Sequence, residues 1–212
     1  MPDLDHEWQF NGPVIGIDEA GRGPWAGPVT VTATWLCPSA YDTLPADIDD
    51  SKKIKPSRRV ALATALMAKP HLYHTVSIEV AQIDQAGILK ATFAGIVMAA
   101  TKLADKMVKA GWDAPVHALV DGNLLPPDMP LPATALVKGD NQSLSIAAAS
   151  LIAKTSRDQI MQNLALAYPD YGWASNMGYG TKAHQAGLDQ FGVTPHHRHS
   201  FKPIRCYLEA GD

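Results

Sequence analysis

Two adjacent carboxylates, Asp18 and Glu19, stand where an apolar run that begins at Val14 meets the glycine-rich segment from Gly21 to Gly27. A Val/Ile run bounded by glycines is typical of a buried strand. A carboxylate at the buried end of such a strand is costly unless it is paired or holds a metal ion. Glycines allow the chain to bend and bring backbone N–H groups close to a ligand. The pattern favours a charged site at a strand end; the alternative is a strand that runs into a solvated turn with both carboxylates exposed.

Two more acidic residues, Asp121 and Asp140, follow the segments Val116 to Val120 and Thr134 to Val137, which are also predicted strands. Ligands of open α/β sheets bind outside the carboxyl ends of strands. Four converging carboxylates would repel one another and stay ionised only around cations. Oxygen ligands without Cys or His indicate Mg²⁺ or Mn²⁺ rather than zinc, and two such ions about 3.5–4 Å apart promote in-line attack of water on a phosphodiester. Unrelated surface acids are the alternative.

Hydrophobic periodicity predicts the elements that must position these acids. The order of strands, then helices interleaved with strands, is typical of an α/β sandwich around a mixed sheet. We expect residues 1–168 to form the core and residues 169–212 to form a small helical appendage rather than an independent domain. Strands are expected from Val14 and over Val29–Trp35, Leu72–Val80, Val116–Val120 and Thr134–Val137. The strand over Val29–Trp35 is expected to be half-buried, because threonines alternate with its apolar residues. Helices are expected over about Pro56–Lys69, Ile88–Val108 with Asp84 as a possible N-cap, Ser143–Tyr168 and Thr181–Phe191.

Size and composition are those of one globular domain. The chain has 212 residues, a mass of 22.7 kDa and 46% hydrophobic residues, which is enough to bury a full core. Its two cysteines, Cys37 and Cys206, lie far apart, which excludes a disulfide framework and a CxxC zinc site. The N-terminus lacks the basic and apolar regions of a signal peptide, and no apolar run approaches the length of a membrane span. We expect a cytoplasmic monomer with no membrane association.

Charge is distributed unevenly although the net charge is only −3. Residues 1–50 hold nine acidic side chains and one basic side chain, Arg22. The next segment, SKKIKPSRR, carries Lys52 and Lys53 among five basic residues. Such a run can neutralise phosphates, so binding would weaken with salt; a solvated face at the start of a helix is the alternative.

Several motifs occur in a fixed order from Val14 to Pro203. They are GIDEAGRGPWAGPV, DSKKI, VDGN, KGD followed by SIAAASLIAKTSRD, GYGT and HRHSFKP. This combination resembles ribonuclease HII, the type 2 ribonuclease H. The resemblance implies a ribonuclease H-like mixed sheet flanked by helices, with a C-terminal helical portion. It also implies a metal-dependent endoribonuclease that cuts the RNA strand of RNA/DNA hybrids, nicks on the 5′ side of ribonucleotides embedded in duplex DNA, and leaves a 5′-phosphate and a 3′-hydroxyl.

The resemblance also implies roles for individual residues. Asp18, Glu19, Asp121 and Asp140 match the catalytic ligands of two divalent ions, Mn²⁺ or Mg²⁺. Substrate would be bound by a glycine loop that senses the ribose 2′-hydroxyl, by an aromatic ring against the next sugar, and by basic side chains. Those residues are Gly21, Arg22 and Gly23 for the loop, Tyr179 for the ring, and Lys52, Lys53 and Arg198 for the basic contacts. Arg198 belongs to a segment from His196 to His199 that we expect to form a partly exposed cluster, which either contacts phosphate or is structural.

Two departures from the family pattern bear on substrate affinity more than on chemistry. Met177 stands where a basic residue commonly precedes the glycine, and Gly87 stands where the family usually has Asn. Asp158 is a reserve candidate for a metal ligand, although its spacing from Lys154 predicts an ordinary surface ion pair. Two rival functions remain: a related nuclease that cuts all-DNA substrates, and a nucleic-acid binding module whose acids hold a structural ion.

Overall fold

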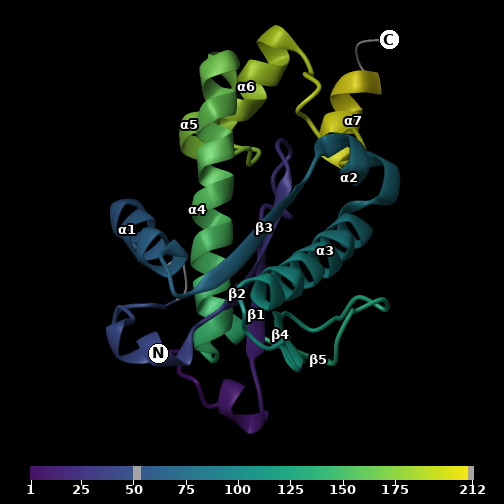
Figure 1. Ribbon diagram of the computed structural model, residues 1–212. Coiled ribbons are helices and arrows are strands. Elements are labelled where there is room, and N and C mark those ends of the chain that lie inside the picture. Colours follow the sequence, from purple (N-terminus) through teal and green to yellow (C-terminus); the bar gives the residue numbers. More distant parts are fainter. Residues whose placement is uncertain (50–53, 210–212) are drawn as a thin grey trace.

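The computed structural model describes residues 1–49 and 54–209 (Figure 1). Five strands form one mixed sheet in the spatial order β3-β2-β1-β4-β5. The strands are β1 Val14–Ala20, β2 Val29–Trp35, β3 Leu72–Ile78, β4 His117–Asp121 and β5 Ala133–Leu136. β2 is antiparallel to β1 and β3, whereas β4 is parallel to β1 and to β5. The carboxyl ends of β1, β4 and β5 therefore meet at one end of the sheet.

Helices cover both faces of the sheet and extend beyond one end of it (Figure 1). No helix in the described ranges is by itself long and apolar enough to span a membrane; α2 and α3 meet that test together, but only as a pair bent by 119°. The α-helices are α1 Pro56–Met67, α2 Val80–Ala86, α3 Ile88–Lys109, α4 Leu144–Ala167, α5 Trp173–Asn176, α6 Lys182–Phe191 and α7 Lys202–Glu209, and short 3₁₀ helices span Glu7–Gln9, Pro38–Thr43, Gly139–Asn141 and Pro169–Tyr171.

The two faces of β1 pack against different long helices. Ile15 and Ile17 belong to the core cluster that contains the apolar face of α3. Gly16 faces the other way, because a Cβ atom there would overlap the backbone of Ser145 in α4. Successive side chains of a strand alternate between faces, so Asp18 lies on the α4 side with Gly16. This close approach of α4 to β1 is what places helix side chains beside the carboxylate.

β2 differs from its prediction as a half-buried strand, because all seven of its residues are buried. The prediction of a half-buried strand rested on the alternation of threonines with apolar residues, a pattern typical of a strand with one solvated face. It was wrong because alternation does not show what covers the polar face. Here the threonine side is covered by protein. The hydroxyls of Thr30 and Ser77 lie 3.2 Å apart and those of Thr32 and Thr75 lie 2.9 Å apart, so β2 and β3 satisfy these groups across the strand pair.

The N-cap prediction at Asp84 was also wrong. Asp84 lies inside α2, and Gly87, with φ of 81°, separates α2 from α3. The Asp84 carboxylate instead accepts hydrogen bonds from the backbone N–H groups of His199 and Ser200 and from the Ser200 hydroxyl. A positive φ suits glycine, which accounts locally for glycine at position 87. Asp84 ties the core to the C-terminal segment.

The C-terminal portion packs directly on the core. Figure 1 shows α5 and α6 beside the C-terminal end of α4. One hydrophobic cluster joins these parts, and it contains Ala26 from the β1–β2 connection, Met161 from α4, and Tyr171, Trp173, Leu188 and Ile204. The helix over 181–191 was predicted, whereas α7 was not. The shared cluster shows that the C-terminal helices pack on the rest of the chain, while the division at residue 168 into a core and an appendage stays a prediction.

Candidate active site

All four predicted carboxylates line one cavity of about 360 Å³. The lining residues are Asp18, Glu19, Ala20, Asp121, Asp140, Ser150, Lys154 and Tyr179. Asp18 and Asp121 are separated by 103 residues in the sequence and Asp140 follows 19 residues later, so their proximity comes from the sheet. Tyr179 was predicted at this site and lies there, while Lys52 and Lys53 fall outside the described residues.

Parallel pairing explains how Asp121 and Asp140 reach this cavity. Ile17 of β1 pairs with Val120 of β4, so the residues that follow them lie side by side. β5 ends at Leu136, and Lys138 then adopts a left-handed conformation with φ of 57° that turns the chain into the 3₁₀ helix carrying Asp140. The Gly139 N–H donates to Asp121 Oδ1 at 2.7 Å. One carboxylate thereby anchors the turn that positions the other.

Asp18 is the most constrained of the acids. It is 6% exposed, and its Oδ1 accepts a hydrogen bond from the Glu19 N–H at 2.7 Å. Burial raises the pKa of Asp18 well above its ordinary value, and the charges of Glu19 and Asp121 raise it further, while a hydrogen bond from Ser150 opposes the shift. A divalent cation would remove this repulsion and desolvation cost, so the oxygen-only donor set fits such an ion.

The carboxylates are close together but are not arranged as a formed coordination sphere. Among residues 1–49 and 54–209, no three His, Cys, Asp or Glu side chains already surround a common ion position. Asp121 Oδ1 is engaged by Gly139 N–H, and Asp140 Oδ1 accepts from Asn141 Nδ2 at 2.8 Å. The ligand roles of the four residues therefore stay predictions, supported by their shared cavity and their electrostatics.

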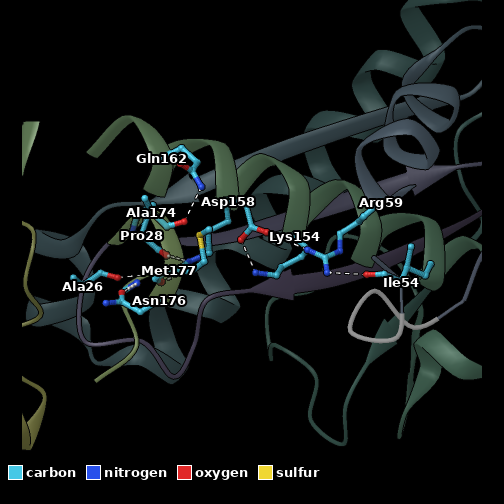
Figure 2. A network of polar contacts seen from close by, with 12 residues as sticks. Ala26, Pro28, Ile54, Arg59, Lys154, Asp158, Gln162, Ala174, Asn176 and Met177 are labelled. Atoms are coloured by element: carbon cyan, nitrogen blue, oxygen red, sulfur yellow. Dashed lines mark hydrogen bonds and ion pairs between the residues drawn. The ribbon is translucent and has the colours of Figure 1, made fainter. Parts of the chain in front are cut away.

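Ser150 and Lys154 are site residues that the sequence reasoning missed. They lie four residues apart on the face of α4 that approaches β1, and both line the cavity. Lys154 Nζ donates to Asp158 Oδ1 at 2.5 Å, and Arg59 Nη1 donates to Asp158 Oδ2 at 3.1 Å (Figure 2). Asp158 thus has two cationic partners and does not line the cavity, which agrees with a structural role. The i, i+4 spacing of Ser150 and Lys154, on the helix that follows Asp140, was the signal that could have identified them.

The glycine loop lies next to Tyr179, which lines the cavity. Tyr179 is 50% exposed. A Cβ atom at Gly23 would lie 3.5 Å from Tyr179 Cε1, so the loop backbone passes close to the ring. Arg22 is half exposed, and its Nη1 lies 3.4 Å from Glu19 Oε1. The structure brings together the loop and the aromatic ring that the family resemblance singles out.

The cluster from His196 to His199 is partly exposed, as predicted, but Arg198 itself is buried, which favours the structural alternative for this residue over contact with phosphate. Arg198 and His197 are both fully buried. The Arg198 guanidinium donates to three carbonyl oxygens of the loop: Gly21 at 2.6 Å from Nη2, Arg22 at 2.9 Å from Nη1 and Gly27 at 2.9 Å from Nε. Sequence could not reveal this role, because the partners lie more than 170 residues away. Arg198 acts on the loop from inside the protein rather than from an exposed surface.

Arg157 is a second buried arginine that donates to backbone carbonyls at the end of this loop and beyond it. It is 1% exposed, and its guanidinium donates to the carbonyl oxygens of Pro28, Met177 and Ala26 at 2.9 to 3.1 Å. Figure 2 shows these acceptors gathered near α4. Burial lowers the pKa of Arg157 to about 10, and burial with the nearby Arg157 charge lowers that of Arg198 to about 9. Both side chains stay cationic at neutral pH, so their hydrogen bonds are charge-assisted.

Comparisons with known proteins show the family to which this chain is similar. The family model described as Ribonuclease HII matches residues 15–204. The curated Ribonuclease HII of Rhodospirillum rubrum is 50% identical over 208 residues, which cover 97% of this chain and 91% of that protein. Ribonuclease HII of Jannaschia sp. (strain CCS1) is 46% identical over 208 residues and 98% of both chains.

Solved structures share the fold at low sequence identity. Ribonuclease H2 from Pyrococcus horikoshii OT3 has a TM-score of 0.77 at 23% identity, over 93% of this chain and 98% of that one. Bst-RNase HIII in complex with Mn²⁺ has a TM-score of 0.79 at 20% identity, over 100% of this chain and 74% of that one. These similarities confirm the predicted ribonuclease H-like fold class.

Proposed function

This chain belongs to the ribonuclease HII family, hydrolases that cleave the RNA strand of RNA/DNA hybrids, and from that membership we propose that it also nicks duplex DNA on the 5′ side of embedded ribonucleotides. The observation that carries the proposal is the single cavity that four acidic side chains share with Tyr179, beside a glycine loop. The products are a 5′-phosphate and a 3′-hydroxyl. The nucleophile is water, and no covalent enzyme intermediate forms.

Asp18, Glu19, Asp121 and Asp140 are the residues that would hold the metal. Their oxygen donors suit Mn²⁺ or Mg²⁺, and the raised pKa of buried Asp18 marks a place where positive charge is favourable. The Mn²⁺ complex of Bst-RNase HIII, which has a similar fold, supports the same choice. Two bound divalent ions would lower the pKa of the attacking water and stabilise charge on the departing 3′ oxygen.

The remaining residues of the cavity position the substrate. Ser150 holds the Asp18 carboxylate by a hydrogen bond, and Lys154 presents an ammonium group beside the acids, where the scissile phosphate would lie. Asp158 holds Lys154 in place. An ammonium at this point attracts the phosphate without closing the cavity to water.

Selection for ribonucleotides is assigned to the loop and to Tyr179. Backbone groups of Gly21, Arg22 and Gly23 recognise the 2′-hydroxyl, the group that distinguishes RNA from DNA. The Tyr179 ring packs against the next sugar and favours deoxyribose there. Buried Arg157 and Arg198 hold the loop in one conformation, so recognition does not require the loop to be ordered on binding. We also propose that the enzyme acts as a cytoplasmic monomer and that Lys52 and Lys53 contact the nucleic-acid backbone.

One cleavage experiment tests this function against its rivals. A labelled duplex with a single embedded ribonucleotide is incubated beside its all-DNA counterpart, with Mn²⁺, with Mg²⁺ and with a chelator. We expect a nick only 5′ of the ribonucleotide and only with metal. Cutting of both duplexes would indicate a DNA nuclease of the same fold, and tight binding without cutting would indicate a binding module.

A further inference from the structure

Tyr179 is held at its backbone by a buried histidine that no part of the proposed function uses. The Tyr179 carbonyl accepts one hydrogen bond from the Thr181 N–H at 2.8 Å and a second contact from His184 Nδ1 at 3.0 Å. His184 is fully buried in the first turn of α6, where Thr181 is the N-cap. The position of the exposed Tyr179 ring therefore depends on a side chain inside the C-terminal portion.

The contacts of His184 determine which ring nitrogen carries its proton. A carbonyl oxygen only accepts, so Nδ1 must be the protonated nitrogen that faces Tyr179. On the other side of the ring, Trp173 Nε1 donates to His184 Nε2 at 3.1 Å. An indole N–H only donates, so Nε2 must be the unprotonated nitrogen. Both contacts require the same neutral tautomer.

His197 provides an independent constraint on the same tautomer. Its Nδ1 accepts from the backbone N–H of Thr194 at 2.9 Å, so its proton is on Nε2. That Nε2 lies 3.0 Å from His184 Nε2 and donates to it. His184 Nε2 therefore accepts from two donors, Trp173 and His197. A proton on this nitrogen would point at two donor hydrogens and lose both hydrogen bonds. Burial lowers the pKa of His184 and lowers that of His197 to about 3, which agrees with two neutral rings.

We propose that His184 is a positioning residue for Tyr179: Trp173 and His197 hold His184 in the tautomer whose Nδ1–H anchors the Tyr179 carbonyl, and this anchor sets the preference for the sugar that follows the ribonucleotide. The proposal rests on the proposed function, because it assumes that Tyr179 reads that sugar. His184 itself lies below the surface and contacts no substrate. Its effect on specificity passes through the backbone of the Tyr179 segment.

Two substitutions at His184 separate this role from simple packing. In His184→Asn the amide nitrogen stands where Nδ1 stood and can still donate to the Tyr179 carbonyl. In His184→Gln the amide group lies near the position of Nε2, where it faces Trp173 and His197 and leaves the carbonyl without its donor. Each variant is assayed on two duplexes, one with a ribonucleotide followed by deoxyribose and one with it followed by ribose. The ratio of kcat/KM for the two duplexes is the readout.

We expect His184→Gln to lower the ratio about fivefold, the effect of one lost hydrogen bond, and His184→Asn to change it by no more than about twofold. Adding His184→Gln to Tyr179→Ala should not lower the ratio further. The matched control is His71→Gln, since His71 is 6% exposed and accepts from the Cys37 N–H, but lies near the start of β3, toward the opposite end of the sheet. That variant should lose stability and keep the ratio.

The outcomes separate the two levels of the argument. A parent enzyme that leaves both duplexes whole refutes the proposed function itself. A parent that nicks, with a ratio that His184→Gln leaves unchanged or that both His184 variants lower equally, refutes the positioning role. The ¹⁵N chemical shifts of the histidine rings in the unaltered protein give a second test that needs no variant to fold: Nδ1–H on His184 is expected, and Nε2–H there would overturn the proposal.

Discussion

Gly21→Ala is expected to destabilise the protein strongly, because the glycine loop is packed against a buried arginine. Gly21 has φ of +95°, a conformation that residues with a Cβ atom rarely adopt. A Cβ atom built there would overlap the Arg157 side chain at Nε. Arg157 is almost fully buried and donates to three backbone carbonyls, so it cannot move without losing at least one of these bonds.

The magnitude follows from these two costs. The left-handed backbone conformation costs about 1–2 kcal/mol with alanine, and the loss of one charge-assisted hydrogen bond costs about 1.5–3 kcal/mol. Together they predict a loss of about 2.5–5 kcal/mol in the free energy of unfolding, from a total of about 5–15 kcal/mol for a typical domain. For a chain of this size the corresponding fall in Tm is about 5–20 °C.

The assay is equilibrium unfolding in urea, followed by tryptophan fluorescence and by circular dichroism, with the midpoint compared at a common slope. Gly23→Ala is the matched control two residues along the same loop. Its φ is outside the left-handed region, and the added Cβ atom would meet only Tyr179 Cε1 at 3.5 Å, an ordinary contact. Gly23→Ala should therefore keep nearly parental stability even where it weakens cleavage. If Gly21→Ala were as stable as Gly23→Ala, the packing of Arg157 against Gly21 would not contribute to the free energy of unfolding as proposed.

Three further predictions concern the acids, the second arginine and acid pH. Asp121→Asn should abolish nicking while the protein stays folded, because an amide oxygen can still accept from the Gly139 N–H but the metal loses a charged ligand; cleavage at the parental rate would remove Asp121 from the catalytic set. Arg198→Lys should lower the free energy of unfolding by about 2–4 kcal/mol, because one ammonium cannot replace a guanidinium that reaches three carbonyls, and an unchanged urea midpoint would contradict this. The pKa of His197 is about 3 in the folded protein and 6.5 ordinarily, so the unfolded chain binds more protons between these values and stability should fall as pH drops from 6.5 toward 3, by at most about 1.4 kcal/mol per pH unit for this group. The measurement is the pH dependence of the urea midpoint in the parent protein and in His197→Gln. Subtracting one profile from the other cancels the contribution of Asp18, whose raised pKa acts in the opposite direction in both proteins. Parallel profiles would contradict the prediction.

Much of the fold could be predicted because its signals are local. Short apolar runs and, for β2 and β3, alternating apolar residues located all five strands, and three-four spacing located α3 and α4 to within about two residues of their bounds. The errors also have local causes. α7 was missed because its segment follows a run of histidines and contains a proline, and β2 was predicted as half-buried because its alternation does not show that α3 and α4 cover both faces.

By itself, the sequence determined that acidic residues stand at the carboxyl ends of β1 and β4 and shortly after β5, and that a glycine loop follows the first of them, since residue type and strand ends are properties of short segments. Only the tertiary structure decided that Ser150 and Lys154 face the same cavity, that Arg198 is buried beneath the loop, and that His184 anchors Tyr179. The physical reason is that burial and hydrogen-bond partners depend on packing between distant segments: Arg198 and the Gly27 carbonyl it binds are separated by 171 residues.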